Sequence, residues 1–183
     1  MTHYLNQMAT GAKKETRQQM ATFYIFEGPD GAGKSTLLQR IAASHQNVKI
    51  VRFSYPKCDA ERTLDFQFNQ YAAPILQEAK SDSVVLLDRS WYSNRVYGNV
   101  MHNQEILSYE QSKALELMVI GAGGGTIVYC TAPINTLWKR CQTRGEDHVK
   151  KQAQLLAIRE GYEELMKLPK CLPVLRIDTG VQW

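Results

Sequence analysis

The segment G-P-D-G-A-G-K-S-T at Gly28–Thr36 constrains the fold of this chain more than any other part of the sequence. It fits the pattern G-x-x-x-x-G-K-[ST] and lies between an apolar run, Phe23 to Phe26, and a helical segment that starts near Leu37. Glycines in such a loop let successive backbone N–H groups face inward at the positive end of a helix dipole, where they attract anions. The context predicts a strand, a phosphate-binding loop and a helix in that order.

The rest of the chain continues this alternation of strands and helices. Short apolar runs predict strands at 22–27, 48–53, 83–88, 126–130 and 173–178. Segments of helical period predict helices at 33–44, 59–80, 92–100, 104–120, 134–142 and 148–168. Such an order is typical of α/β proteins in which helices cover a parallel sheet. We therefore expect a three-layer P-loop fold with a five-stranded parallel sheet between helices and a short lid.

Length and composition set the frame for the search for a function. The 183 residues suffice for one domain, which we expect at 21–183 after a flexible tail at 1–20. The tail lacks the apolar run of a signal peptide or membrane span, so we expect a cytoplasmic protein with no membrane partner. The four cysteines are widely spaced and predict reduced thiols. A net charge of +4 without a basic stripe argues against nucleic acid as a partner.

The residues of the loop predict a site for ATP and Mg²⁺. We expect Lys34 to reach the β- and γ-phosphates and Ser35 to bind Mg²⁺. A second metal contact is expected from Asp88, which ends an apolar strand, and the neighbouring Arg89 can bind another anionic group. An alternative is that Asp88 and Arg89 only cap the next helix. The loop residues expected to bind ATP are Gly28, Asp30, Gly31, Ala32, Gly33, Lys34, Ser35 and Thr36.

Two other classes of phosphate-loop protein fit the sequence less well. A GTPase switch is expected to carry an N-K-x-D element, which this chain lacks. A motor ATPase usually has a catalytic glutamate beside the strand-end aspartate, whereas this strand ends in Asp88-Arg89-Ser90. A kinase is therefore the favoured interpretation.

Several segments resemble thymidylate kinases. The loop E-G-P-D-G-A-G-K-S-T, the element V-R-F-S-Y-P at 51–56, the segment D-R-S-W-Y-S-N-R-V-Y-G at 88–98 and L-R-I-D-T at 175–179 are similar to motifs of that family in the same order. The resemblance implies transfer of a phosphoryl group from Mg·ATP to a deoxynucleoside monophosphate, most simply dTMP. It leaves open whether the chain forms a homodimer.

The same resemblance assigns roles to individual residues. It implies that the acceptor nucleotide is bound by Asp30, Arg52, Tyr55, Phe68, Arg89 and Tyr97. It also implies that the segment after Asp178 lies against the adenine of ATP, and that 137–148 is a lid. Because the phosphate loop has no arginine, we expect Arg140 or Arg144 of the lid to act in catalysis with Lys34 and Arg89. A solvated helix end is the alternative for the two lid arginines.

Two alternative acceptors remain open. The text D-R-S-x-Y-S-x-R is also similar to the E-R-S-x-Y-S-x-R segment of deoxynucleoside kinases, which phosphorylate a sugar hydroxyl. That chemistry requires a carboxylate base, but where those enzymes have Glu-Pro this chain has Ser54-Tyr55-Pro56-Lys57, and the nearest acids are Asp59 and Glu61. Arg52 favours an acceptor that is already phosphorylated. A kinase acting on modified DNA is the third interpretation.

Overall fold

A five-stranded parallel sheet forms the centre of the protein. The computed structural model describes residues 20–53, 56, 58–145 and 149–180. The strands are β1 (Thr22–Glu27), β2 (Val48–Arg52), β3 (Val84–Asp88), β4 (Gly125–Thr131) and β5 (Val174–Asp178). Their order in the sheet is β2-β3-β1-β4-β5, and every neighbouring pair is parallel. Because β1 is central, the loop that follows it emerges from the middle of the carboxyl edge.

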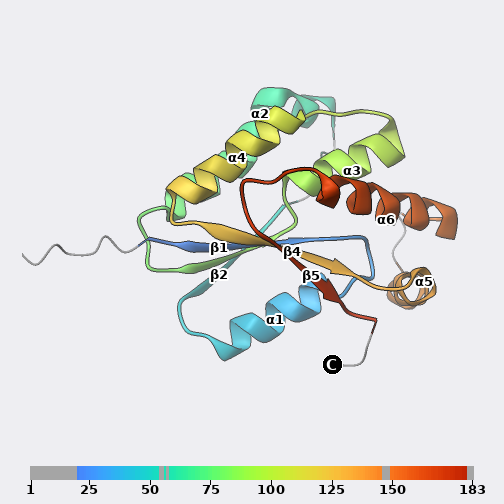
Figure 1. Cartoon of the computed structure of the whole chain (residues 1–183). Coiled ribbons are helices and arrows are strands. Elements are labelled where there is room, and N and C mark those ends of the chain that lie inside the picture. The colour runs from blue at the N-terminus through green and yellow to red at the C-terminus, as the bar shows by residue number, and fades with distance from the viewer. Residues whose placement is uncertain (1–19, 54–55, 57, 146–148, 181–183) are drawn as a thin grey trace, which may run out of the picture.

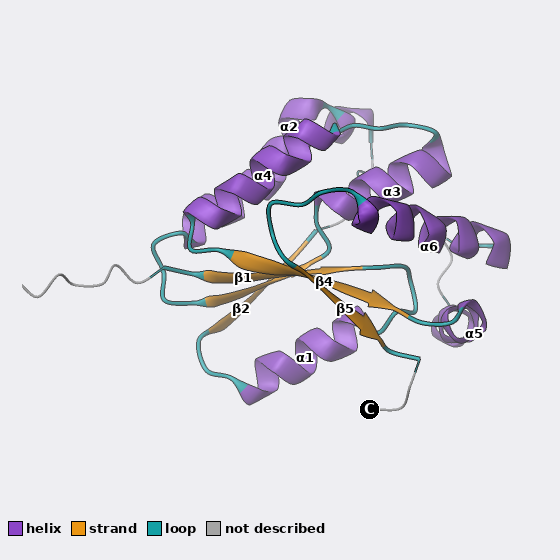
Figure 2. Cartoon of the chain, in the orientation of Figure 1, coloured by secondary structure: helices purple, strands orange, loops and turns teal. Residues whose placement is uncertain are grey.

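Helices cover both faces of this sheet (Figure 1). Helix α1 (Lys34–Ser44) lies on one face, and α2 (Leu64–Glu78), α3 (Trp91–His102), α4 (Tyr109–Gly121) and α6 (Gln152–Lys167) lie on the other. Helix α5 (Ile134–Arg144) follows β4 beyond the carboxyl end of the strands (Figure 2). A short 3₁₀ helix at Asp59–Arg62 precedes α2. The predicted three-layer α/β fold with a five-stranded parallel sheet is confirmed.

The central strands are buried on both sides, as a sheet between two helical layers requires. In β1, Phe23, Ile25 and Phe26 are almost fully buried, and β3 buries Val85 and Leu87 as completely. Helix α6 contributes a stripe to the same core, with Leu155, Ile158, Tyr162 and Leu165. The core thus fixes the carboxyl ends of β1 and β3, which carry the phosphate loop and the Asp88-Arg89 pair.

Two predicted helices begin five residues later in the structure, α2 at Leu64 and α4 at Tyr109. The predicted helix at 104–120 begins only at Tyr109, because Asn103 ends α3 in a left-handed conformation and Ser108 starts α4 with a capping box to Gln111. The predicted helix at 59–80 is divided, and the hydroxyl of Thr63 accepts a hydrogen bond from the Phe66 N–H at the start of α2.

Other predictions concern the ends of the chain, its cysteines and membranes. The expected flexible tail at 1–20 lies almost wholly outside the described residues. All four cysteines are free thiols. Within the described part of the chain, no helix has both the length and the apolar character needed to cross a membrane.

Candidate active site

The phosphate loop occupies the turn between β1 and α1, as the sequence predicted. Gly28 and Gly31 have positive φ angles of 137° and 75°. A side chain at Gly28 would collide with the backbone oxygen of Cys130, and a Cβ at Gly31 would lie 2.6 Å from the backbone oxygen of Leu137 in α5. Only glycine allows this close packing at both positions. The loop is therefore wedged between β4 and α5.

Lys34 is folded back onto the loop. Its ammonium group donates hydrogen bonds to the backbone oxygens of Gly28 and Pro29, at 2.7 and 2.8 Å. Burial and, to a lesser extent, the positive charge of Arg89 lower the pKa of Lys34 to about 8. The phosphates of a bound nucleotide would provide the counter-charge that this buried lysine needs.

Asp30 and Arg89 form an ion pair across the site. Arg89 takes a positive φ of 72° after β3, and its guanidinium contacts Asp30 Oδ1 and Ser93 Oγ, the latter at 3.3 Å. Tyr97 donates a hydrogen bond to Asp30 Oδ2 at 2.8 Å, and the Arg89 guanidinium lies 4.9 Å from the centre of the Tyr97 ring. Burial acts to lower the pKa of Arg89, but Tyr97 and Asp30 raise it above its ordinary value. Arg89 is thus held as a cation.

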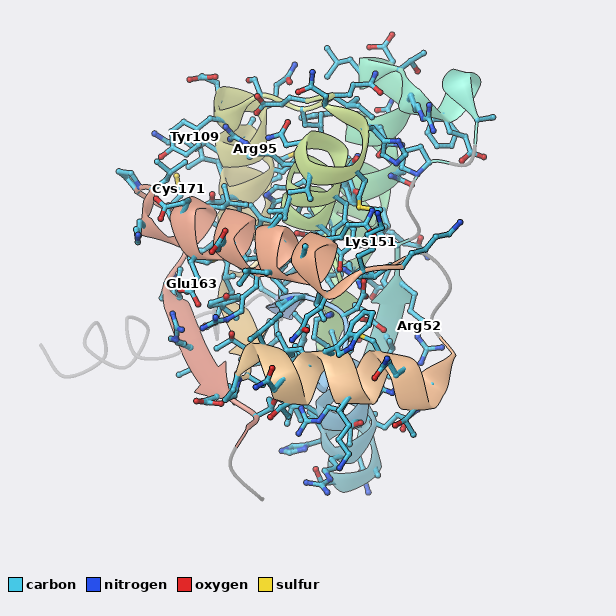
Figure 3. The ribbon with its side chains drawn as sticks, turned by 90° about the vertical axis from the view of Figure 1, so that its right-hand side faces the viewer. Arg52, Arg95, Tyr109, Lys151, Glu163 and Cys171 are labelled. Atoms are coloured by element: carbon cyan, nitrogen blue, oxygen red, sulfur yellow. The ribbon has the colours of Figure 1, made fainter. Side chains whose placement is uncertain are left out.

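A cleft of about 190 Å³ runs along the phosphate loop. Its lining comprises Asp30, Gly31, Ala32, Gly33, Lys34, Ser35, Arg52, Phe53, Asp88, Arg89 and Arg144. Arg52 and Asp88 end neighbouring strands and form an ion pair, with 3.5 Å between Nε and Oδ2. In the view of Figure 3, Arg52 lies near the C-terminal end of α5, where Arg144 is located. Four cationic side chains from four segments thus converge on one cleft.

The cleft also has oxygen ligands suited to a magnesium ion. Ser35 and Asp88 both line it, and the Asp88 side chain is 13% exposed. The described residues contain no group of three or more acidic, histidine or cysteine side chains arranged to hold a metal ion. Mg²⁺ is commonly bound by one or two protein oxygens together with substrate phosphates and waters, so this pair fits it.

Ser90, rather than Asp88 or Arg89, caps the helix that follows β3. Its hydroxyl accepts a hydrogen bond from the Tyr92 N–H at 3.3 Å. Asp88 and Arg89 are paired with Arg52 and Asp30 instead. The alternative in which they serve only as helix caps is therefore wrong.

The structure gives the two lid arginines different positions. Arg140 donates to Gly31 O at 3.1 Å, to Thr179 Oγ1 at 3.1 Å and to Thr179 O at 2.8 Å. It therefore ties α5 to the phosphate loop and to the segment after β5. Arg144, one turn further along α5, lines the phosphate cleft itself.

A second cavity of about 300 Å³ opens beside the phosphate cleft. It is lined by Phe53, Tyr71, Arg89, Ser90, Ser93, Asn94, Tyr97, Met101, His102 and Val149. Phe53 and Arg89 line both spaces. This arrangement provides a largely apolar pocket with a cation at its junction with the phosphate site, which suits a nucleoside attached to a phosphate.

Of the other predicted acceptor residues, Tyr97 lines the pocket and Tyr55 lies outside the described residues. Phe68 lines neither cavity and instead packs against the core, whereas Tyr71, one turn further along α2, lines the pocket. On the donor side, Asp178 accepts a hydrogen bond from the Gly180 N–H at 2.8 Å and lines none of the cavities described above. Thr36 is exposed in the first turn of α1.

Comparison with known proteins identifies the family. The family model of polyphosphate kinase 2 (PPK2) matches residues 3–155. The chain belongs to the PPK2 family. The resemblance to thymidylate kinases was therefore wrong at the level of the family, because the shared text lies in elements that P-loop kinases of different families have in common. No curated protein matches the chain significantly.

Solved structures share the fold of this chain. The YorR protein of Bacillus subtilis, crystallised with phosphorylated GDP, is 26% identical, with a TM-score of 0.65 over 88% of this chain and 87% of that one. Polyphosphate kinase 2 of Arthrobacter aurescens TC1 is 17% identical, with a TM-score of 0.63 over 87% of this chain and 61% of that one. Deoxyadenosine kinase of M. mycoides with bound dATP is 16% identical, with a TM-score of 0.58 over 87% and 91% of the two chains. Membership of the PPK2 family supports a nucleotide kinase that uses ATP or polyphosphate, and these neighbours share its P-loop kinase fold.

Two residues of this PPK2 site were not predicted from the sequence. Glu27, fully buried, accepts hydrogen bonds from the hydroxyls of Ser90, Ser93 and Tyr162 at 2.5, 2.6 and 2.9 Å, and burial raises its pKa. It joins β1 to α3 and α6 directly behind the phosphate loop. Thr179 donates to Ala32 O at 3.1 Å and accepts from Arg140. The available signals were the position of Glu27 immediately before the loop and the position of Thr179 at the end of the L-R-I-D-T element, but neither residue was assigned a role.

Proposed function

We propose that the chain transfers a phosphoryl group from ATP or polyphosphate to the phosphate of a nucleoside monophosphate. The observation that carries this proposal is the junction between the two cavities. Phe53 and Arg89 line both the cationic cleft at the phosphate loop and the apolar pocket beside it. A nucleotide whose base and sugar occupy the pocket would present its phosphate to the cleft.

The polarity of the pocket favours a phosphorylated acceptor over a free hydroxyl. A hydroxyl acceptor must lose a proton and needs a nearby base, commonly a carboxylate. Among the described residues, the side chains that line this pocket include no carboxylate, and the two aspartates of the adjacent cleft are paired with arginines. An ionised phosphate needs no base and gains from Arg52 and Arg89.

The reaction balances without an additional proton acceptor. An oxygen of the acceptor phosphate attacks the terminal phosphorus of the donor, and a new P–O bond forms. The bond from that phosphorus to its bridging oxygen breaks, and the electron pair leaves with ADP or with the shortened polyphosphate. Lys34 and Arg144, which both line the cleft, would stabilise the charge that spreads over the transferring oxygens.

Magnesium would supply further charge neutralisation when bound with the donor phosphates. Ser35 and Asp88 are the side chains that would hold it. Asp88 already offsets the charge of Arg52, so the ion pair between them would adjust when a metal and a phosphate enter together.

The proposed donors rest on the family and on a groove along α5. This groove is lined by Asn135, Thr136, Lys139, Arg140, Thr143 and Arg144. Arg144 also lines the phosphate cleft, so the groove continues the cationic surface outward. Both a nucleoside triphosphate and a polyphosphate chain are compatible with such a surface.

The test is a two-way panel of donors and acceptors. The purified chain with Mg²⁺ is supplied with ATP or polyphosphate and with each common nucleoside, its 5′-monophosphate or a short DNA duplex. We expect a diphosphate product from at least one monophosphate and none from nucleosides or DNA. Phosphorylation of nucleosides or of the duplex, with every monophosphate left unchanged, would refute the proposed acceptor class.

A further inference from the structure

A series of hydrogen-bonded side-chain amides links the start of α2 to Asn94, a residue that lines the acceptor pocket. Gln67 Nε2 donates to the backbone oxygen of Glu61, which can only accept. The other amide atom, Gln67 Oε1, must then be an acceptor, and it receives hydrogen bonds from Gln70 Nε2 at 2.6 Å and from Asn94 Nδ2. Each amide orientation therefore determines the next. Asn94 is oriented with its amino group toward Gln67 and its oxygen away from it.

Asn94 Oδ1, at the end of this series of amides, has no hydrogen-bond partner among the described residues. Asn94 is 4% exposed, and its Oδ1 atom is buried without a hydrogen bond among the described residues. Leaving a buried acceptor unsatisfied is costly, and such atoms are rare in folded proteins. Asn94 is also one of the residues that line the acceptor pocket. The fixed amide thus leaves an unused acceptor on a residue of the pocket wall.

We infer that Asn94 Oδ1 reads an N–H donor on the base of the acceptor nucleotide. This inference rests on the proposed role of the pocket as the acceptor site. Gln67, which holds the Asn94 amide without lining the pocket, is a positioning residue. A bound base would satisfy Asn94 Oδ1 and recover the hydrogen bond that the free protein lacks.

The surroundings favour a base over the other parts of a nucleotide. A phosphate has no donor at neutral pH and is attracted instead to Arg89, at the junction with the phosphate cleft. Phe53 and Tyr71 form the aromatic part of the pocket wall, with ring centres 4.8 Å apart and planes 63° apart. Aromatic faces and edges of this kind suit the flat surface of a base. A sugar hydroxyl could also donate, and the test separates the two.

The first experiment measures binding in the absence of a phosphoryl donor. Each of four monophosphates is compared with a derivative in which methyl groups replace base hydrogens: AMP with N6,N6-dimethyl-AMP, GMP with 1-methyl-GMP, CMP with N4,N4-dimethyl-CMP and UMP with 3-methyl-UMP. We expect the tightest-binding monophosphate to lose about 10- to 100-fold in affinity on methylation, since a buried acceptor is left unpaired. Equal affinity within every pair, the result expected for a contact to the sugar, would overturn the inference.

The second experiment separates hydrogen bonding from steric exclusion. Asn94→Leu keeps a similar volume but has no acceptor, so we expect it to abolish most of the preference for the unmethylated base. Asn99→Leu, an exposed position on the same helix, is the control and should keep the preference. Gln67→Leu should weaken the preference, because the Asn94 amide is then free to rotate. A full preference retained in Asn94→Leu would overturn the inference.

Failure of the proposed function gives a different result. If the methylation preference depends on Asn94 but no monophosphate is phosphorylated, the base contact stands and the proposed reaction fails. If a monophosphate is phosphorylated but its binding is indifferent to methylation, the reaction stands and the role of Asn94 fails.

Discussion

Arg89, at the end of β3, holds Asp30 of the phosphate loop in an ion pair, although the two residues are 59 positions apart in the chain. Tyr97 donates to the second oxygen of the same carboxylate. The contact fixes the phosphate loop relative to α3, which forms much of the acceptor pocket. The phosphate cleft and the apolar pocket beside it are thereby joined through one ion pair.

Replacing Asp30 tests how much this contact contributes to the fold. Asp30→Asn keeps the shape but removes the negative charge from beside Arg89, whose side chain is 24% exposed. We expect a loss of about 2 to 3 kcal/mol in the free energy of unfolding, measured with urea, because a partly buried guanidinium is left uncompensated. Tyr97→Phe removes only the hydroxyl and should cost about 1 kcal/mol. Unchanged stability in Asp30→Asn would show that the ion pair is not structural.

The pKa of Lys34 predicts a pH dependence for phosphate binding. With a pKa of about 8 in the free protein, Lys34 is charged below that pH and becomes neutral above it. A bound phosphate favours the charged form, so affinity should be constant just below pH 8 and fall by up to about tenfold per unit above it. ADP binding between pH 7.5 and 9.5 measures this.

The matched variant for this experiment is Lys34→Met. It should bind ADP more weakly at pH 7.5, and its affinity should change little across the same range.

The same pKa determines how the free energy of unfolding changes with pH. In the window from about 8 to the ordinary lysine value, the unfolded chain binds more protons, so this lysine makes the free protein more stable as pH rises. A wild-type affinity that increases with pH would contradict the assignment.

Replacing the two arginines of α5 should have different effects, one on catalysis and the other on stability. Arg144→Met removes a cation from the cleft, and we expect kcat to fall by about 100- to 1,000-fold with little change in stability. Arg140→Met breaks three hydrogen bonds to Gly31 and Thr179 and should lower the free energy of unfolding by about 1 to 3 kcal/mol. Steady-state kinetics together with urea unfolding separate them. A large loss of kcat in Arg140→Met and a loss of stability alone in Arg144→Met would contradict these assignments.

Arg52 tests the acceptor phosphate. Its side chain is 62% exposed, so Arg52→Met should leave stability unchanged. It should nevertheless raise the KM for the monophosphate acceptor by about 10- to 100-fold, as expected for loss of one charge-assisted contact. Lys49→Met is the control, because Lys49 lies on the same strand but pairs with Glu78 at 2.6 Å. An equal effect of both variants on KM would indicate a general charge effect.

The sheet and the phosphate loop could be predicted from the sequence because their signals are local. Strand β1 has the predicted bounds, and the glycines of the loop are required by close approach to Cys130 and Leu137. The start of α4 was mispredicted, although Ser108 and Gln111 spell a capping box. The helical period of apolar residues extends to the N-terminal side of Tyr109, so the predicted helix began at 104 and the capping box was overlooked.

The site was predictable where a strand end carries a charged residue, and not where contacts join distant segments. Arg52, Asp88 and Arg89 follow apolar runs, so the parallel sheet brings them to one edge. The orientation of Asn94 depends on Gln67, a partner on another helix, and periodicity cannot show it. The family was misjudged for a related reason, since the motifs quoted describe a phosphate loop and a strand end that several kinase families share.

The most direct test of the central claim is a competition within one reaction. The chain, Mg²⁺ and either ATP or polyphosphate are incubated with equal amounts of guanosine and GMP, and then with the adenine, cytosine and uracil pairs, and the products are identified by mass spectrometry. The account predicts that, for at least one base, the monophosphate is converted to the diphosphate while the nucleoside remains unchanged. New monophosphate formed from a nucleoside, with no diphosphate from any base, would contradict it.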